Sequence, residues 1–189
     1  ALPICRVYGV HLPEADVKRA VNAWRRANTW AIEHGQALEE AYTRAMRNVG
    51  REFSAGRVTY LFDGLTLWYA LPSGRVLCYP FARLEPEGVS YAKASWKPKA
   101  DAKEWPRGRL WRGLACENVT QATANDLLRH SLRQLDNVVL HVHDEIVLEV
   151  PEEETEAAKQ RLQDVMCTAP DWASDLPLKI GVEVSTRFK

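Results

Sequence analysis

The stretch from residue 140 to residue 150, LHVHDEIVLEV, limits the fold of this chain more than any other. β-Branched and aliphatic residues flank it at strand length, with Val138–Leu140 and Val142 on one side and Ile146–Leu148 on the other. This pattern predicts two buried strands in a hairpin whose turn falls at or beside Asp144-Glu145. Charged side chains amid such flanks are seldom there for solubility alone, and loops on a rigid support commonly carry chemistry. The hairpin tip is therefore the first candidate site.

The composition limits the class of protein. A chain of 189 residues can bury a sizeable core, as one domain or as one domain with an appended subdomain. The 25 basic and 25 acidic residues balance, so the total charge does not indicate a nucleic-acid partner. The four cysteines lie far apart without Cys-x-x-Cys spacing, which argues against a zinc site and against a compact disulfide framework.

The sequence also lacks the features of a membrane protein. No apolar run approaches the roughly 18 residues that span a bilayer, and the first ten residues do not resemble a signal peptide. We therefore expect a soluble, cytoplasmic protein with no membrane partner. Because the chain begins at Ala1 without an initiator methionine, we also expect it to be a piece of a longer polypeptide.

The first half of the chain divides into a helical part and a β-rich part. Apolar side chains recur with helical period over residues 13–27 and 30–49, which predicts two helices. Residues 57–84 alternate β-prone runs with the turn signals Asp63-Gly64 and Pro72-Ser73-Gly74, which predicts a three-stranded meander. Asp63 is a candidate catalytic carboxylate, but an Asp-Gly pair between two strands is explained by turn geometry alone, and we favour the turn.

Residues 93–112 are locally basic although the whole chain is neutral. Seven basic residues face two acidic ones there, and three tryptophans are interleaved: Lys93, Lys97, Lys99, Lys103, Arg107, Arg109 and Arg112, with Trp96, Trp105 and Trp111. Basic side chains neutralise phosphates and indoles stack on bases, so the segment fits a nucleic-acid contact. It equally fits a solvated loop whose tryptophans anchor it to the core, and composition leaves both interpretations open.

Residues 114–135 predict a helix with two distinct faces. The predicted buried face consists of Ala124, Leu127, Leu128, Leu132 and Leu135. A polar stripe, spaced by three, four and four residues, consists of Asn118, Gln121, Asn125 and Arg129. Amides and a cation can donate hydrogen bonds to the acceptors that every base pair shows in the minor groove. The alternative is an ordinary exposed face that happens to be rich in amides.

The last part of the chain predicts a helix and a strand. Residues 151–166 begin with proline and three glutamates, which favours a helix whose acidic start is structural rather than metal-binding. Residues 178–184 then predict a final strand.

Three interpretations of the hairpin tip compete. His141 and His143 could share a zinc ion, but His11, His34 and His130 show no ligand-like pattern that would complete the site. The tip could be a polar turn with no chemical role. In the third interpretation, Asp144 binds magnesium through oxygen and assists phosphoryl or nucleotidyl transfer.

Two sequence segments resemble a known family. The strings VHDEIVLEV and ENVTQATANDLL are similar to the third conserved motif of the family A DNA polymerases and to the helix that precedes it. The order of elements agrees as well, and the resemblance is specific over about residues 110–189. Upstream, the opening VYGVHLPEADVKRAVNAWRRAN and the LPSGR hairpin resemble the phage-type branch of the family.

The resemblance implies an α/β (α+β) fold. It would contain a palm-like small antiparallel sheet with a His-Asp-Glu hairpin, backed by helices, together with a helical N-terminal part and a β-meander. Residues 1–50 would be a helical segment derived from the fingers, and residues 51–112 a β-meander with a basic, Trp-rich loop. Residues 113–189 would be the palm portion with the catalytic hairpin.

The resemblance also implies roles for individual residues. Asp144 would be one of two magnesium-binding aspartates, Glu145 would support the metal site, and His143 would lie near the primer terminus. Gln121 and Asn118 would contact the minor groove of primer-template DNA, and Arg112 the DNA backbone. Asn125 and Arg129 complete the stripe expected to bind DNA, and deoxynucleoside triphosphates would be the substrates of the parent enzyme.

The sequence departs from the family at two places. It contains no match to the Asp-Tyr-Ser-x-x-Glu type of motif that supplies the second aspartate, or to the helix with an arginine and a lysine that binds the triphosphate. One aspartate cannot hold two magnesium ions beside a substrate. We therefore expect the isolated chain to have little or no polymerase activity. A non-catalytic DNA-binding module or a decayed prophage remnant is the alternative.

Overall fold

The structure is a computed structural model that describes residue 9 and residues 12–93 and 105–187. It divides into two compact units. Unit 1 comprises Ala1–Trp68 and Cys78–Cys116, and unit 2 comprises Tyr69–Leu77 and Glu117–Lys189. Within the described residues the fold is mixed α/β, with four α-helices and small antiparallel sheets. None of the described helices has the length and apolarity needed to cross a membrane.

Unit 1 begins with two helices, α2 (Glu14–Ala27) and α3 (Thr29–Arg47), which confirm the helical prediction. The buried side of α3 is formed by aliphatic and aromatic side chains at helical spacing, among them Leu38, Ala41, Tyr42 and Ala45. On α2 only Val17 is buried. Trp24 of α2 is 55% exposed.

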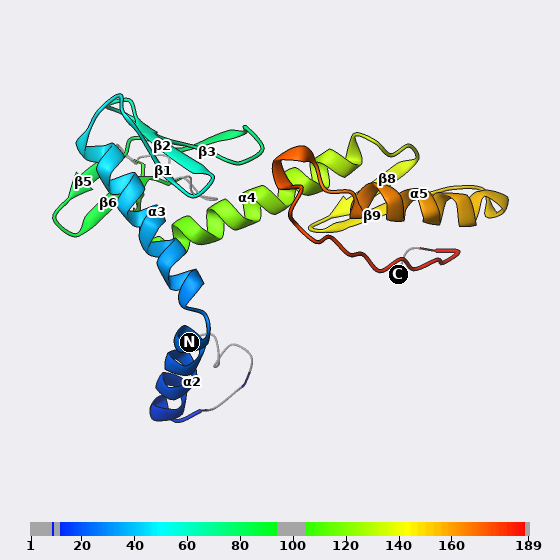
Figure 1. The fold of residues 1–189 in the computed structure, drawn as a ribbon, viewed down its shortest axis with the longest axis horizontal. Coiled ribbons are helices and arrows are strands. Elements are labelled where there is room, and N and C mark those ends of the chain that lie inside the picture. The colour runs from blue at the N-terminus through cyan, green and yellow to red at the C-terminus, as the bar shows by residue number, and fades with distance from the viewer. Residues whose placement is uncertain (1–8, 10–11, 94–104, 188–189) are drawn as a thin grey trace. The chain divides into compact units, whose positions relative to one another are not determined.

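Helix α3 packs against the first sheet, as Figure 1 shows. Four strands follow one another in this sheet in chain order: β1 (Glu52–Ala55), β2 (Val58–Phe62), β3 (Leu67–Ala70) and β4 (Val76–Tyr79). The rings of Tyr42 and Tyr60 meet edge to face with centroids 5.9 Å apart, and both side chains are buried. The predicted meander is present, but it has four strands rather than three, because β1 pairs with β2.

A second sheet in unit 1 has the order β5-β6-β7. Its strands are β5 (Arg83–Glu85), β6 (Gly88–Ala92) and β7 (Arg107–Leu110), and both pairings are antiparallel. Val89 and Leu110 lie opposite each other and are almost completely buried. This sheet includes the end of the basic segment, whereas residues 94–104 of that segment lie outside the described residues.

Asp63 has the turn role that the sequence favoured. Its carboxylate accepts hydrogen bonds from the backbone N–H groups of Leu65 and Thr66, and from the indole N–H of Trp68 at 2.7 Å. The bond from Trp68, followed by the two backbone bonds, lowers the pKa of Asp63 below its ordinary value. Gly64 has φ +100°, a conformation that favours glycine. These contacts account for the Asp-Gly pair by turn geometry.

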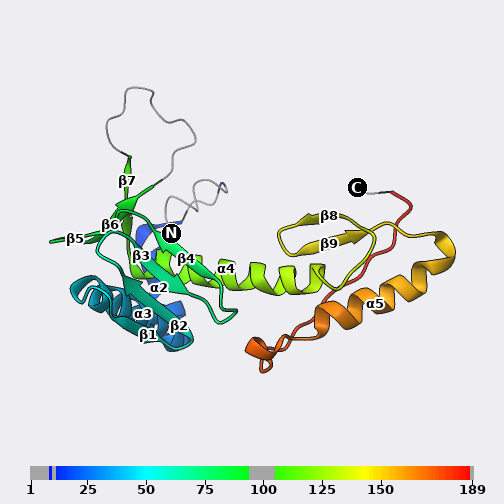
Figure 2. The same ribbon diagram turned by 90° about the horizontal axis from the view of Figure 1, so that it is seen from above.

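Unit 2 contains most of α4 (Arg112–Leu132) and the elements that follow it. These are β8 (Val138–Val142), β9 (Glu145–Leu148), the 3-10 turn η1 (Glu152–Glu154), α5 (Thr155–Cys167) and the 3-10 turn η2 (Asp171–Ala173). Figure 2 shows the path of the chain from α4 through the β8–β9 pair to α5. The predicted acidic helix start is therefore a 3-10 turn of glutamates followed by the α-helix proper.

The prediction of a strand over residues 178–184 is wrong. The chain is irregular there, and no described strand pairs with it. β-prone side chains form a strand only where a neighbouring strand pairs with the backbone, so their spacing alone does not determine the outcome.

Candidate active site and nucleic-acid interface

The β8–β9 pair presents the candidate catalytic residues at one end. Val142 is paired with Glu145, so His143 and Asp144 form the two-residue connection. His143 has φ +53°, in the left-handed region that residues other than glycine seldom adopt. His143, Asp144 and Glu145 are all exposed, and so is His141. The structure thus brings these four side chains together within one short, solvent-accessible segment.

The apolar support of this loop differs from the sequence prediction. The flanking strands were predicted to be buried, but β8 is exposed over most of its length. Val139 is 56% exposed, and Leu140 and Val142 are each 39% exposed. In β9 the residues from Ile146 to Leu148 are half-buried, so this strand of the pair is covered more than β8. The N–H of Glu149 donates to the carbonyl of Asn137 at 3.1 Å and closes the base of the hairpin.

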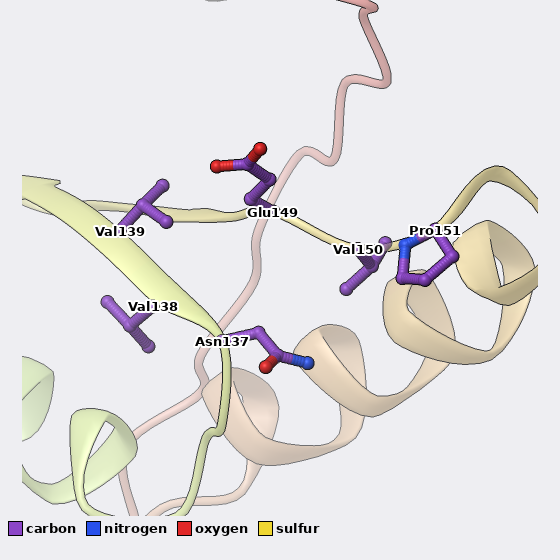
Figure 3. Close-up of a pocket in the computed structure, with 6 residues that line it drawn as sticks. All are labelled: Asn137, Val138, Val139, Glu149, Val150 and Pro151. Atoms are coloured by element: carbon purple, nitrogen blue, oxygen red, sulfur yellow. The ribbon is translucent and has the colours of Figure 1, made fainter.

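A shallow hollow lies at the base of the hairpin, away from the loop. Figure 3 shows the six residues that line it: Asn137, Val138, Val139, Glu149, Val150 and Pro151. Glu149 is the one ionisable side chain in this set, and none of the loop residues takes part. The side chains for which the sequence predicts chemistry therefore lie at the exposed loop and not in this hollow.

The described side chains limit which metal ions this loop could hold. Among residues 9, 12–93 and 105–187, no three His, Cys, Asp or Glu side chains are grouped so that they could hold a metal ion. The zinc interpretation of His141 and His143 therefore lacks its further ligands within this part of the chain. The exposed carboxylate of Asp144 suits magnesium, which takes one or two protein carboxylates together with water and substrate phosphates.

Helix α4 carries the polar stripe on its surface. Gln121, Asn125 and Arg129 are exposed, and Asn118 is half-buried. The amide of Gln121 donates to the carboxylate of Glu117 at 3.4 Å, a long contact that leaves the side chain accessible. The stripe is therefore available to a ligand along most of its length.

The predicted buried face of residues 114–135 is only partly confirmed. Leu128 and Leu135 are buried, and Leu127 and Leu132 are half-buried. Ala124 is exposed, so its assignment to the buried face was wrong. The buried positions also include Ala115 and Val119 near the start of the helix, so the buried face is rotated from the one predicted from the leucines.

A buried carboxylate on α4 was missed by the sequence reasoning. Asp126 is 7% exposed and contacts two residues of the β3–β4 turn, Ser73 and Arg75. The available signal was an aspartate directly before two leucines, because a carboxylate beside a buried face needs a partner. The sequence predicts Ser73 only as part of a turn, and Arg75 enters only as the last residue of the LPSGR hairpin.

The described part of the basic segment is only partly free to bind phosphates. The guanidinium group of Arg107 donates to Ser90 Oγ at 2.7 Å and to the carbonyl of Phe81 at 3.0 Å, and Arg109 donates to the carbonyl of Glu87. These two arginines thus stabilise the second sheet. Arg112, at the start of α4, is exposed.

The two described tryptophans of this segment do not anchor it to a core. Trp105 is 61% exposed and Trp111 is 55% exposed. The exposure of these two side chains argues against the interpretation in which tryptophans anchor the segment to the core. Trp96 and the three lysines at 97, 99 and 103 lie outside the described residues.

Comparison with known proteins agrees with the resemblance found in the sequence. Residues 111–189 match the family model for DNA polymerase family A. The DNA polymerase of Bacillus phage SP02 is 33% identical over 183 residues, which cover 94% of this chain and 28% of the phage protein. The thermostable DNA polymerase I of Thermus filiformis is 39% identical over 79 residues, which cover 38% of this chain and 9% of that protein. No solved structure gives a significant match.

The two relatives are DNA polymerases, and with the match to the family model over residues 111–189 they confirm the resemblance to the family A DNA polymerases. The segment spans little more than a quarter of the length of the phage relative. The matched region, residues 111–189, contains both α4 and the β8–β9 pair, so it includes the two candidate parts of the site.

Proposed function

We propose that this chain is the part of a template-directed DNA polymerase that supplies one metal-binding aspartate and a helix in contact with the primer-template duplex. One observation carries the proposal. The region that matches the polymerase family includes both an exposed Asp144 at a strand connection and an exposed amide stripe on α4. In this proposal residues 113–189 belong to the palm, residues 1–50 are helical and derived from the fingers, and residues 51–112 form the β-rich part. We propose a cytoplasmic location for this polymerase part.

The loop residues would act at the primer terminus. Asp144 would hold magnesium through a carboxylate oxygen, and Glu145 would add negative charge beside it. When bound, magnesium neutralises charge on the transferring phosphate and aligns the attacking 3′-hydroxyl. His143, on the same connection, would donate a hydrogen bond near the primer end. Their exposure supports this assignment, because a ligand can reach all three side chains.

The residues of α4 would hold the duplex. Gln121 and Asn118, with Asn125 and Arg129 along the same stripe, would donate hydrogen bonds to N3 of purines and O2 of pyrimidines. Every base pair shows such acceptors, so these contacts fit an enzyme that copies any sequence. Arg112 would bind a backbone phosphate.

We propose further that the isolated chain does not extend primers at an appreciable rate. Its sequence offers Asp144 but no counterpart of the second aspartate motif, and two-metal transfer needs both. A primer-extension assay with magnesium, all four deoxynucleoside triphosphates and the 189-residue chain tests this. Robust extension would falsify it.

A non-catalytic DNA-binding module is the second candidate, favoured by the same gap in the sequence. A chimaera of the phage SP02 polymerase, with its matching segment replaced by this chain, separates the two functions. Primer extension by the chimaera supports the polymerase assignment, whereas DNA binding without extension supports the module.

The role of Gln121 can be tested in the same chimaera. We expect Gln121→Ala to reduce extension much more than it reduces thermal stability, because the side chain is exposed. Gln163→Ala, at an exposed position on α5, is the matched control and should change neither quantity. Equal losses of activity and stability in Gln121→Ala would point to a structural role.

A further inference from the structure

The turn between β3 and β4 has a conformation that its sequence specifies. The N–H of Gly74 donates to the carbonyl of Leu71 at 2.9 Å, and the N–H of Leu71 donates to the carbonyl of Arg75 at 2.8 Å. Gly74 has φ +82°, which glycine adopts without strain, and Pro72 fits the position after Leu71. The side chains of Ser73 and Arg75 therefore leave a rigid turn in defined directions.

Both of these side chains reach α4 within unit 2. Ser73 Oγ donates to Oδ2 of Asp126 and accepts the backbone N–H of Arg75 at 3.3 Å. Arg75 Nε lies 2.7 Å from Oδ1 of Asp126, as an ion pair whose N–H is not aligned for a hydrogen bond. Arg75 Nη2 donates to the carbonyl of Ala122 at 2.7 Å. The turn thus holds α4 at two positions one helical turn apart.

These two positions are immediate neighbours of the polar stripe. Ala122 follows Gln121 in the helix, and Asp126 follows Asn125. Arg129, the last residue of the stripe, has Nη1 3.8 Å from Oδ1 of Asp126. Residues four apart lie above one another on a helix, so contacts at positions 122 and 126 resist rotation of α4 about its axis. Such a rotation would turn the amides away from a fixed ligand.

We propose that Ser73 and Arg75 are positioning residues for the DNA-contacting face of α4, acting through Asp126 and the carbonyl of Ala122. This inference rests on the proposed function, in which the stripe donates hydrogen bonds to the minor groove. The β3–β4 turn itself does not need to touch DNA. It sets the direction in which Gln121 and Asn125 present their amides.

Two duplexes distinguish positioning from simple loss of affinity. One is an ordinary primer-template, and the other carries 3-deazapurines, which lack the N3 acceptor of the minor groove. Fluorescence anisotropy at low salt measures the dissociation constants of the 189-residue chain for each. We expect the chain to bind the ordinary duplex about fivefold more tightly, as a small number of hydrogen bonds allows. Gln121→Ala should lower this ratio, because it removes one of the proposed donors.

The positioning variants should behave like Gln121→Ala in this ratio. Arg75→Gln removes the ion pair, and Ser73→Ala removes only one hydroxyl, so the second variant provides the test if the first does not fold. Arg161→Gln is the control, because it also removes an arginine bond to a backbone carbonyl, that of Gln134 at 3.0 Å. It should retain the fivefold ratio.

The outcomes separate this inference from the proposed function. If Gln121→Ala lowers the ratio while Arg75→Gln and Ser73→Ala retain it, the positioning inference is overturned and the minor-groove contact stands. If Arg75→Gln weakens binding to both duplexes by the same factor, so that the ratio is unchanged, the positioning inference is overturned as well. If the unmodified chain binds the two duplexes equally, both proposals are overturned.

Discussion

The ion pair between Arg75 and Asp126 gives the sharpest prediction about stability. Truncation by Arg75→Ala removes the nearer cation from a carboxylate whose side chain is 6% exposed, and leaves it only the Arg129 guanidinium group, whose Nη1 lies 3.8 Å away. Removing one partner of a buried pair costs about 3–5 kcal/mol, because the remaining charge is uncompensated. The Arg75 side chain is 27% exposed, and Ser73 still donates to Asp126 in the variant. We therefore expect a loss of about 2–3 kcal/mol in the free energy of unfolding.

Urea unfolding of the 189-residue chain measures this loss as a lower midpoint at an unchanged slope. Arg161→Ala, at an exposed hydrogen bond, is the control and should cost less than about 1 kcal/mol. The double variant Arg75→Ala/Asp126→Ala should lose less than the sum of the two single variants, since it leaves no buried charge unpaired. An Arg75→Ala loss no larger than the control, or strictly additive losses, would refute the reasoning.

Three further predictions concern other parts of the chain. Burial, followed by the nearby Glu39 carboxylate, raises the pKa of Tyr42 above 10.0, so the stability that this group contributes is lost as the pH rises beyond about 10. The melting temperature should therefore decline less between pH 10 and pH 12 in Tyr42→Phe than in the unsubstituted chain. An equal decline in the two proteins would contradict this. The pKa of Asp63 is lowered by its hydrogen bonds, so its contribution is present above the ordinary value of 3.8 and disappears as the pH falls through the lower folded value. Asp63→Ala should lower the melting temperature at neutral pH and leave duplex affinity unchanged, whereas a selective loss of affinity would return Asp63 to the candidate site. Binding of duplex DNA should be weak, independent of sequence and steeply reduced by salt; an affinity that stays flat from low to moderate salt would exclude phosphate contacts as its source.

Local patterns predicted the elements whose structure depends on local contacts. The period of the apolar residues located α2 and α3, and the Asp-Gly and Pro-Ser-Gly signals located the turns of the meander. The change from aliphatic to charged residues located the connection between β8 and β9 to within one residue. In each case the side chains and backbone that determine the outcome are close together in the sequence.

The failures involve partners that are distant in the sequence. Residues 178–184 have a strand-like composition but no strand to pair with among those described. β8 is apolar but largely exposed, because burial depends on what covers a face and not on its composition. The contact between Arg75 and Asp126 joins residues 51 positions apart, and no periodicity indicates that a turn will meet a particular helix.

The resemblance to polymerases supplied what the residues alone left open. The amide stripe and the basic segment could each be an ordinary solvent-exposed surface, and the family match supports the proposed DNA contact only for the region that contains the stripe. Exposure of Trp105 and Trp111 adds an independent reason to consider the basic segment as a ligand surface, although Arg107 and Arg109 are engaged within the fold.

The central claim is that Asp144 is a metal-binding carboxylate of nucleotidyl transfer. The most direct measurement is the rate of single-nucleotide addition by the SP02 chimaera carrying Asp144→Asn, compared with the same chimaera carrying Asp136→Asn, another exposed aspartate of unit 2. Loss of a metal ligand removes several kcal/mol of transition-state stabilisation, so we expect the first variant to be slower by at least about a hundredfold and the second to be unaffected. Equal rates for the two variants would contradict the account.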